Sequence, residues 1–500
     1  MTIQAHPPEK TGSPEIEAMF ARYGKRYRSW VVLTAMLGAF AVVMEATIVN
    51  IALPEIVAAF GVSHDIVQLV ATSFLAATAV AMLASAWAVQ RYGLRRVYVT
   101  AMGVFVVFST AAALAPTTHF YVLALCRIGQ GIVAGLIQPL AMVAMMSVYP
   151  PHKRGRAMSM YGLGIVLSPA IGPMLGGLLV DHFGWRPVFV ITTPACLVGA
   201  MLATRYLVAG SRAAGMPEIK LDIVGVALLT LALLGLLSGL TLLLEAGSAR
   251  SPLFLLLGAL SLAGFIAWET RLPHPLLDLS LLRNRGFLAA SWVTVAYGMG
   301  LYGSTYLVPL FVRDVMHFGA FEAGLMLLPG GVVLAVALLV AGRLTDRISP
   351  ARVVIGGLIF FALSSALLAT STPQSGFWLL ALWVALGRVG LGAIIPGLNT
   401  GAVKLMAHDS MTKISATVNF LRQLGGAVGV TLLAVFLEAR QRGYAVETAR
   451  AITGAGESGL RNWLQAANGF AESFLLVALV FVLALWPARK MMRAMEARSR

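Results

Sequence analysis

The stretch GLGIVLSPAIGPMLGG, residues 162–177, indicates how this chain folds. It lies in a long apolar run, yet it contains glycines, a serine and two prolines where a stable helix would use Leu, Val and Ile. Gly164, Ser168, Gly172 and Gly176, the small-residue stripe, recur every four residues. This spacing places them on one helix face, where a neighbouring backbone can approach closely. The stretch therefore predicts a helix packed tightly among other helices.

The composition shows which solvent surrounds that helix. Hydrophobic residues make up 59% of the 500 residues, charged residues only 12%, and the mean hydropathy is +0.84. Soluble domains carry about 25% charge, so we expect an integral membrane protein. The first 28 residues are too polar for a cleavable signal peptide. Cys126 and Cys196 lie in apolar runs, so neither a disulfide framework nor a metal site is expected.

Fourteen apolar runs are long enough to cross about 30 Å of hydrocarbon as helices. The predicted spans are approximately 30–53, 66–89, 97–115, 120–148, 157–180, 187–207, 223–244, 252–269, 287–311, 321–341, 353–370, 376–401, 414–437 and 468–486. With cytoplasmic termini, most of the 37 Lys and Arg residues fall in cytoplasmic segments, as the positive-inside rule requires. The net charge of +16 is therefore a topology signal that also favours anionic lipid, and no nucleic-acid partner is expected.

Internal repeats divide the chain into two halves. AWAVQRYGLRRV (86–97) aligns with GRLTDRISPARV (342–353) at an offset of 256, and CRIGQG (126–131) echoes GRVGLG (387–392). Such halves are typical of secondary transporters. We expect an all-α polytopic protein with two pseudo-symmetric six-helix halves and two inserted helices. The predicted domains are a cytoplasmic tail (1–29), an N-terminal bundle (30–208), a linker with inserted helices 7 and 8 (209–270), a cytoplasmic interfacial segment (271–286), a C-terminal bundle (287–487) and a basic cytoplasmic tail (488–500).

Several motifs resemble those of the major facilitator superfamily, specifically its fourteen-helix drug:proton antiporter branch of EmrB and QacA type. They are MEATIVNIALPEI (44–56) in span 1, RIGQG (127–131) in span 4, the antiporter motif GIVLSPAIGPMLGG (164–177) in span 5, and NFLRQLGGAVG (419–429) in span 13. The loop after span 2 resembles the superfamily's Gly-x-Leu-x-Asp-Arg-x-Gly loop, although Ala86 and Gln90 replace its first Gly and its Asp. The resemblance implies the major facilitator fold and export across the bacterial cytoplasmic (inner) membrane.

The antiporter motif and the loop motif suggest two mechanical elements. Prolines lack the N–H that bonds back along a helix, so span 5 is expected to bend and to form a close contact between the halves. The residues of this contact are Gly164, Ser168, Pro169, Gly172, Pro173, Gly176 and Gly177. The loop residues are expected to cap helix ends and form a cytoplasmic gate. They are Arg91, Gly93, Arg96, Asp346 and Arg347.

Charged residues within spans mark a candidate coupling site, because burying charge in hydrocarbon is costly. Glu45 in span 1 and Arg127 in span 4 fall in the outer half of the membrane and could meet. The family places an acid, usually Asp, at the position of Glu45, so we predict that this pair couples transport to protons. A purely structural ion pair is the alternative. Arg388, the mate of Arg127 in the second half, is expected to hydrogen-bond to backbone carbonyls.

Polar and aromatic residues on spans 1, 4, 9 and 12 suggest a lining for small amphiphilic substrates. They are Asn50, Gln130, Gln138, Tyr297, Tyr302, Tyr306 and Asn399. Each could instead serve a hydrogen bond between helices.

Three function classes were compared. The favoured function is proton-driven export of hydrophobic or amphiphilic compounds, including cations. The alternative is uptake by a symporter or facilitator of the same fold, and the antiporter motif argues against it. A membrane enzyme is disfavoured because His-Glu-x-x-His, Gly-x-Ser-x-Gly and a metal-ligand cluster are absent from the sequence. The ATP-binding pattern Gly-x-x-x-x-Gly-Lys-[Ser/Thr] is absent from the sequence too. The expected energy source is therefore a proton gradient, and no cofactor is expected. In double-membraned bacteria the branch often works with a periplasmic adaptor, which is a candidate partner.

Overall fold

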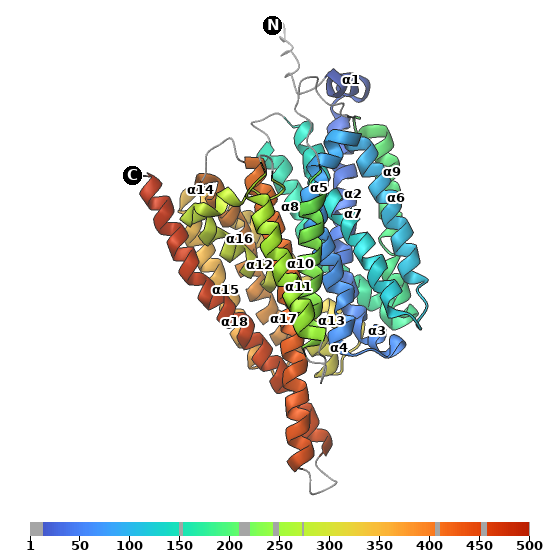
Figure 1. The fold of residues 1–500 in the computed structure, drawn as a ribbon, viewed down its shortest axis with the longest axis vertical. Coiled ribbons are helices and arrows are strands. Elements are labelled where there is room, and N and C mark those ends of the chain that lie inside the picture. The colour runs from blue at the N-terminus through green and yellow to red at the C-terminus, as the bar shows by residue number, and fades with distance from the viewer. Residues whose placement is uncertain are drawn as a thin grey trace.

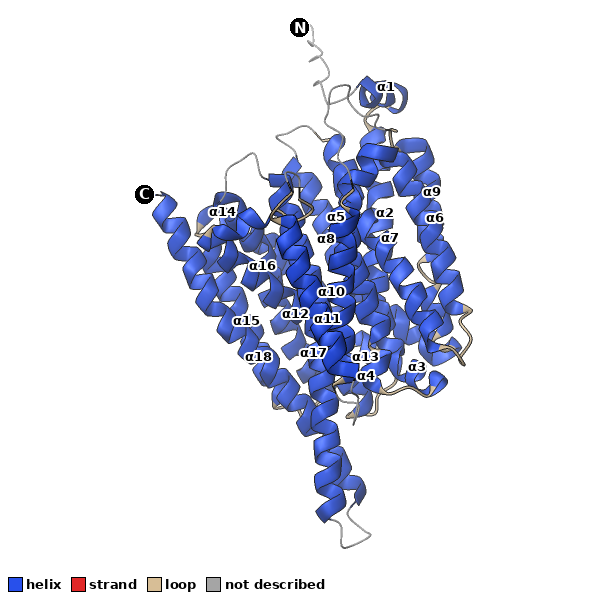
Figure 2. Ribbon diagram, in the orientation of Figure 1, coloured by secondary structure: helices blue, strands red, loops and turns tan. Residues whose placement is uncertain are grey.

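A computed structural model describes residues 14–149, 154–209, 221–243, 250–272, 275–405, 411–451 and 458–499. These residues are almost entirely helical and contain no strand (Figure 2). The first half contains α1 (Pro14–Tyr23), α2 (Arg26–Ile48), η1 (Val49–Ala52), α3 (Leu53–Phe60), α4 (His64–Val67), α5 (Leu69–Tyr92), α6 (Leu94–Ala113), α7 (Phe120–Ser147), α8 (Arg154–Phe183), η3 (Arg186–Phe189) and α9 (Thr193–Tyr206).

The remaining helices lie between the two halves and in the second half. Between the halves lie α10 (Ile223–Leu242) and α11 (Arg250–Glu269). The second half contains η4 (Leu279–Arg283), α12 (Arg285–Asp314), α13 (Ala320–Leu325), α14 (Leu328–Arg347), α15 (Pro350–Ala369), α16 (Phe377–Leu405), α17 (Met411–Ala451) and α18 (Ser458–Ser499). The predicted all-α architecture is confirmed.

The two sets of helices lie side by side, with α2, α6, α7 and α9 on one side and α14, α15, α16 and α18 on the other (Figure 1). They meet along two seams, where α5 packs on α17 and α8 packs on α13 and α14. The inserted pair α10 and α11 lies over the front, and α10 touches both α5 and α17. Helix α1 and the C-terminal end of α18 share one end of the bundle. We call the opposite end, with α3, α4 and α13, the distal end.

Thirteen helical segments of the described residues are long and apolar enough to cross a membrane. Helix α8 occupies the predicted fifth span but is not among these thirteen. The count of fourteen spans therefore stays a prediction, whereas a polytopic membrane bundle is confirmed.

Two connections between predicted spans have structure of their own. Between spans 13 and 14, α17 continues through Ala451 and α18 begins at Ser458, and the pair projects beyond the distal end (Figure 1). Side chains hold this extension together, because Arg440 pairs with Glu472 and the Tyr444 hydroxyl donates to the same carboxylate over 2.8 Å. The segment 271–286 was expected to contain a short interfacial helix, and its helical part is the single short turn η4.

Candidate functional site

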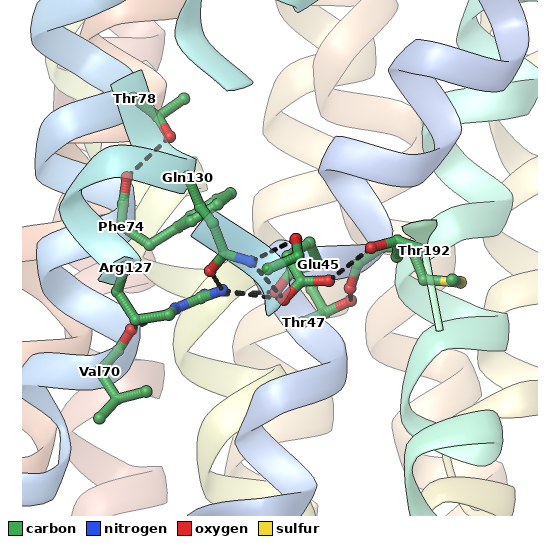
Figure 3. Close-up of polar contacts among 10 residues, drawn as sticks. Glu45, Thr47, Val70, Phe74, Thr78, Arg127, Gln130 and Thr192 are labelled. Carbon is green, nitrogen blue, oxygen red and sulfur yellow. Dashed lines mark hydrogen bonds and ion pairs between the residues drawn. The ribbon is translucent and has the colours of Figure 1, made fainter. Parts of the chain in front are cut away.

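Glu45 is at the centre of a polar network inside the first half (Figure 3). Helix α2 places its side chain among apolar neighbours, with 0% of the residue exposed. One carboxylate oxygen, Oε1, accepts from Nη1 of Arg127 over 3.2 Å and from Nε2 of Gln130 over 3.3 Å. The other, Oε2, accepts from the hydroxyl of Thr192 over 3.0 Å. Hydrogen bonds to both oxygens stabilise the charged form of a buried carboxylate.

Arg127 is equally buried and equally well bonded. Its Nε donates to the carbonyl of Val70 over 2.8 Å, and its Nη1 also donates to Oε1 of Gln130 over 2.9 Å. Its Nη2 donates to the backbone carbonyl of Glu45 over 3.3 Å. The guanidinium lies over the ring of Phe74, 4.3 Å from the centroid. The fork of donors thus ties α7 to α2 and α5, as the planar geometry of arginine allows.

The predicted meeting of Glu45 and Arg127 is therefore present in the structure. Gln130, expected to face substrate, belongs to this network, because it lies one helical turn after Arg127. Sequence reasoning missed Thr192, since a threonine within an apolar run carries no distinctive signal. The carboxyl of Glu45 can carry one negative charge or be protonated, and its network links it to α2, α5 and α7 and to Thr192, the residue before α9.

The other predicted cavity residues are not brought into one pocket. Tyr297, Tyr302 and Tyr306 are buried along α12, whereas Asn399 on α16 is exposed. Asn50 donates across the two halves to the carbonyl of Thr305 over 3.4 Å. Gln138 is buried on α7. Their role in substrate binding stays a prediction.

The small-residue stripe contacts a different partner from the one expected. A Cβ on Gly172 would lie 3.0 Å from Cγ of Met44, and a Cβ on Gly176 would lie 2.8 Å from Cγ1 of Ile48. Both neighbours are on α2, in the same half. Span 5 was expected to form a close contact between the halves, and α8 does pack on α13 and α14, but Gly172 and Gly176 lie on its face toward α2. The sequence shows which residues share a helix face but not which neighbour that face meets.

The contact between the halves uses the next face of α8. A Cβ on Gly177 would lie 2.1 Å from the carbonyl oxygen of Ala320, and one on Gly324 would lie 2.2 Å from that of Pro173. No side chain larger than hydrogen fits at either glycine without moving a backbone. Pro169 and Pro173 lie within α8, which remains one continuous helix. The motif therefore packs α8 against α2 on one face and against α13 on another.

Charged residues reinforce this interface at the distal end. Asp181 near the end of α8 accepts from the backbone N–H of Ala320 over 3.0 Å and of Phe321 over 2.7 Å. Arg313 at the end of α12 pairs with Glu55 on α3 and donates to the carbonyl of Ile51 over 2.8 Å. These residues were missed, although opposite charges at the distal ends of spans 1 and 9 were a usable signal. They join the halves, so the distal end is closed in this structure.

The predicted cytoplasmic gate is less well defined. Gly93 separates α5 from α6 with φ of 81° and ψ of 151°, a conformation that favours glycine. Arg91, Arg96 and Arg347 are exposed. The side chain of Asp346 lies outside the described residues, so the gate stays a prediction. Arg388 does not form the hydrogen bonds expected of it: within the described chain its buried Nη1 has no partner.

Groups of three or more His, Cys, Asp or Glu that could hold a metal do not occur in the described part of the chain.

Comparison with known proteins gives a consistent picture. The sequence profile of the Major Facilitator Superfamily matches residues 35–430. The chain is 29% identical over 410 residues to the multidrug export protein EmrB of Haemophilus influenzae, covering 80% of this chain and 79% of that protein. It is 25% identical over 492 residues to the methylenomycin A resistance protein of Streptomyces coelicolor, covering 98% of each. A bacterial homologue of the human lysosomal transporter Spinster, solved inward-facing and unoccupied, superposes with a TM-score of 0.67 at 17% identity, covering 94% and 99%.

Proposed function

Because this chain belongs to the major facilitator superfamily, we propose that it exports small amphiphilic compounds in exchange for protons by alternating access. The observation that carries the proposal is the fully buried pair of Glu45 and Arg127. An acid inside the membrane is costly unless it is used or paired. Here it is paired with a group that keeps its charge, so protonation of Glu45 changes the energy of the pair.

Protonation would act first on α2. A neutral Glu45 loses its Coulomb attraction to Arg127, which weakens the link between α2 and α7. Close to Glu45 on the same helix, Met44 and Ile48 touch Gly172 and Gly176 of α8. A small movement of α2 is therefore passed directly to α8.

Helix α8 would pass that movement to the seam between the halves. Its Pro173 and Gly177 are the residues in backbone contact with Gly324 and Ala320 of α13. Two tightly packed interfaces on one helix favour discrete arrangements over gradual bending. The closed distal end is one such arrangement. Opening the distal end would expose Glu45 to the side of the membrane that this end faces.

The substrate class rests on the relatives. The Haemophilus relative is named for multidrug export and the Streptomyces relative for methylenomycin A resistance. By analogy we propose that this chain recognises small amphiphilic molecules, cations among them. The predicted cavity residues Asn50, Gln138, Tyr297, Tyr302, Tyr306 and Asn399 are the first candidates for contact with them.

The orientation follows from the charge pattern. We propose that the end carrying α1 faces the cytoplasm and that the distal end faces outward, in the inner membrane of a bacterium. The projecting ends of α17 and α18 would then stand outside, where a periplasmic adaptor could reach them.

Dye retention in cells tests the direction of transport. Cells that express the chain are expected to retain less of a cationic fluorescent dye than vector controls while the proton gradient is intact. An uncoupler should abolish the difference. Greater retention than the controls would instead indicate uptake, and a difference that survives the uncoupler would exclude proton coupling.

A further inference from the structure

Arg388 is a buried cation of the second half, and the described residues give it no counter-charge. Arg388 on α16 is 3% exposed, and its Nη1 has no hydrogen-bond partner. Across the described residues Arg388 forms no ion pair, in contrast to Arg127 at the corresponding place in the first half. Arginine does not escape this cost by losing its proton, because a guanidinium stays protonated in proteins. Among the described residues, no carboxylate balances this charge, which leaves it available to a bound anion.

Neighbouring residues increase the positive charge. Arg422 on α17 acts electrostatically, like Arg388, on the hydroxyl of Tyr297. Its Nε is also buried without a partner. Ion pairs among the described residues of the second half lie elsewhere, between Arg440 and Glu472 and between Arg442 and Glu438. Two guanidiniums thus share a region where no described carboxylate pairs with either.

A small pocket borders this region, between α12, α15, α16 and α18. Arg388 lines it together with Ser304, Ser364 and Ser365, and Phe361 and Phe474 form part of its apolar wall. The hydroxyl of Ser304 donates to the carbonyl of Leu301, and that of Ser364 donates to the carbonyl of Trp383 over 2.6 Å. Ser365 is the third serine of this lining, on α15 beside Ser364.

We propose that this pocket binds one halide-sized monovalent anion, held by Arg388 and the hydroxyl of Ser365. Of the two guanidiniums, Arg388 lines the pocket and Arg422 is not part of the lining, so one positive charge faces the ion and balances a single negative charge. The apolar wall offers nothing to replace the hydration shell of sulfate or phosphate, which favours weakly hydrated ions such as chloride and bromide. The pocket lies within one half and not between the two. This position favours a resident ion over a transported compound.

Thermal unfolding of the purified full-length chain tests the proposal at constant ionic strength, as gluconate is replaced by bromide, chloride, acetate or sulfate. Ligands that bind only the folded state raise its unfolding temperature. We expect bromide and chloride to raise the midpoint by about 3 °C or more at saturation, while any general salt effect of acetate or sulfate should be the same in the parent and in Arg388→Gln. Crystals grown with bromide should show its anomalous signal beside Arg388.

Variants locate the effect. Arg388→Gln should lose the halide shift, and Ser365→Ala should weaken the apparent halide affinity about fivefold, the effect of one lost hydrogen bond. Ser291→Ala is the matched control, because Ser291 is a buried serine of α12 that bonds its own helix and does not line the pocket. If Arg388→Gln does not fold, Ser365→Ala and the bromide signal still decide the question. A halide shift that persists unchanged in Arg388→Gln, or stabilisation by acetate alone, would overturn the proposal.

Discussion

Nη1 of Arg127 lies 3.2 Å from Oε1 of Glu45, and neither side chain is exposed to solvent. The pair joins α7 to α2 within one half, while the contacts between the halves at the distal end lie on α3, α8, α12 and α13. The proposed coupling pair is therefore separate from the contacts that close the distal end. Helix α2 connects them, because it contains Glu45 and also packs on the small-residue stripe.

Arg127→Lys tests whether the geometry of the pair matters beyond its charge. Lysine keeps the positive charge but cannot reach Val70, Gln130 and Glu45 together. We expect proton-driven export to fall at least about tenfold, a cost on the scale of one or two lost charge-assisted hydrogen bonds. Arg352→Lys, at an exposed arginine of α15, is the control and should transport normally. Equal export by both variants would show that charge alone suffices.

Gly177→Leu and Gly324→Leu test the contact between α8 and α13. Each leucine would push its side chain into a facing backbone, so the distal end should not close. We expect folded protein in the membrane with export lost in a vesicle assay. Gly103→Leu is the matched control, because nothing lies within 4 Å of a Cβ at that helical glycine.

Gly172→Leu and Gly176→Leu act on another interface. They should separate α8 from α2, close to Glu45. We therefore expect them to impair the coupling of transport to protons more strongly than they impair closure of the distal end. Vesicle assays distinguish the two effects: a coupling defect spares downhill substrate movement, and a closure defect does not. Normal coupled export by these two variants would show that the stripe is ordinary packing.

Charge reversal tests the ion pair of Glu55 and Arg313. Each single reversal, Glu55→Arg or Arg313→Glu, should favour an open distal end, and the double reversal should restore closure. Spin labels at Thr117 and Gln374, exposed residues of the two halves, would report the distance by pulsed electron resonance. Longer distances are expected in both single variants. A double variant as open as the singles would mean that the pair does not hold the distal end closed.

Much of the fold could be predicted because hydrophobic run length and loop charge are sufficient to define membrane helices. The extensions of α17 and α18 could not be predicted, because a solvated helix of mixed charge has the same composition as a loop. Only the structure shows the partners, such as Arg440 and Glu472, that hold the two helices together. At the site, a charged residue within an apolar run identified Glu45 and Arg127. Thr192 and Asp181 escaped notice, because their importance depends on which helices become neighbours.

The orientation of α8 shows the same limit. The period of four correctly grouped Gly172 with Gly176, but only the structure shows that this face meets α2 and that Gly177 meets α13. Similarly, Gln130 was expected to line the substrate cavity, but the structure shows it bonded to Arg127 and Glu45.

Proton-driven accumulation in vesicles tests the central claim most directly. Purified chain would be reconstituted with an acidic lumen, and uptake of a cationic dye would be compared with exchange of the dye in the absence of a pH gradient. We expect the parent to concentrate the dye up to about tenfold, the highest ratio that a gradient of one pH unit sustains for one-to-one electroneutral exchange. Glu45→Asp should retain part of this activity, and Glu17→Gln, on the exposed face of α1, should retain all of it.

The decisive variant is Glu45→Gln, which mimics the protonated carboxyl. It should fail to concentrate the dye, yet still exchange it down a gradient at a rate similar to the parent. If Glu45→Gln concentrated the dye as well as the parent at matched levels of reconstituted protein, Glu45 would not be the coupling residue.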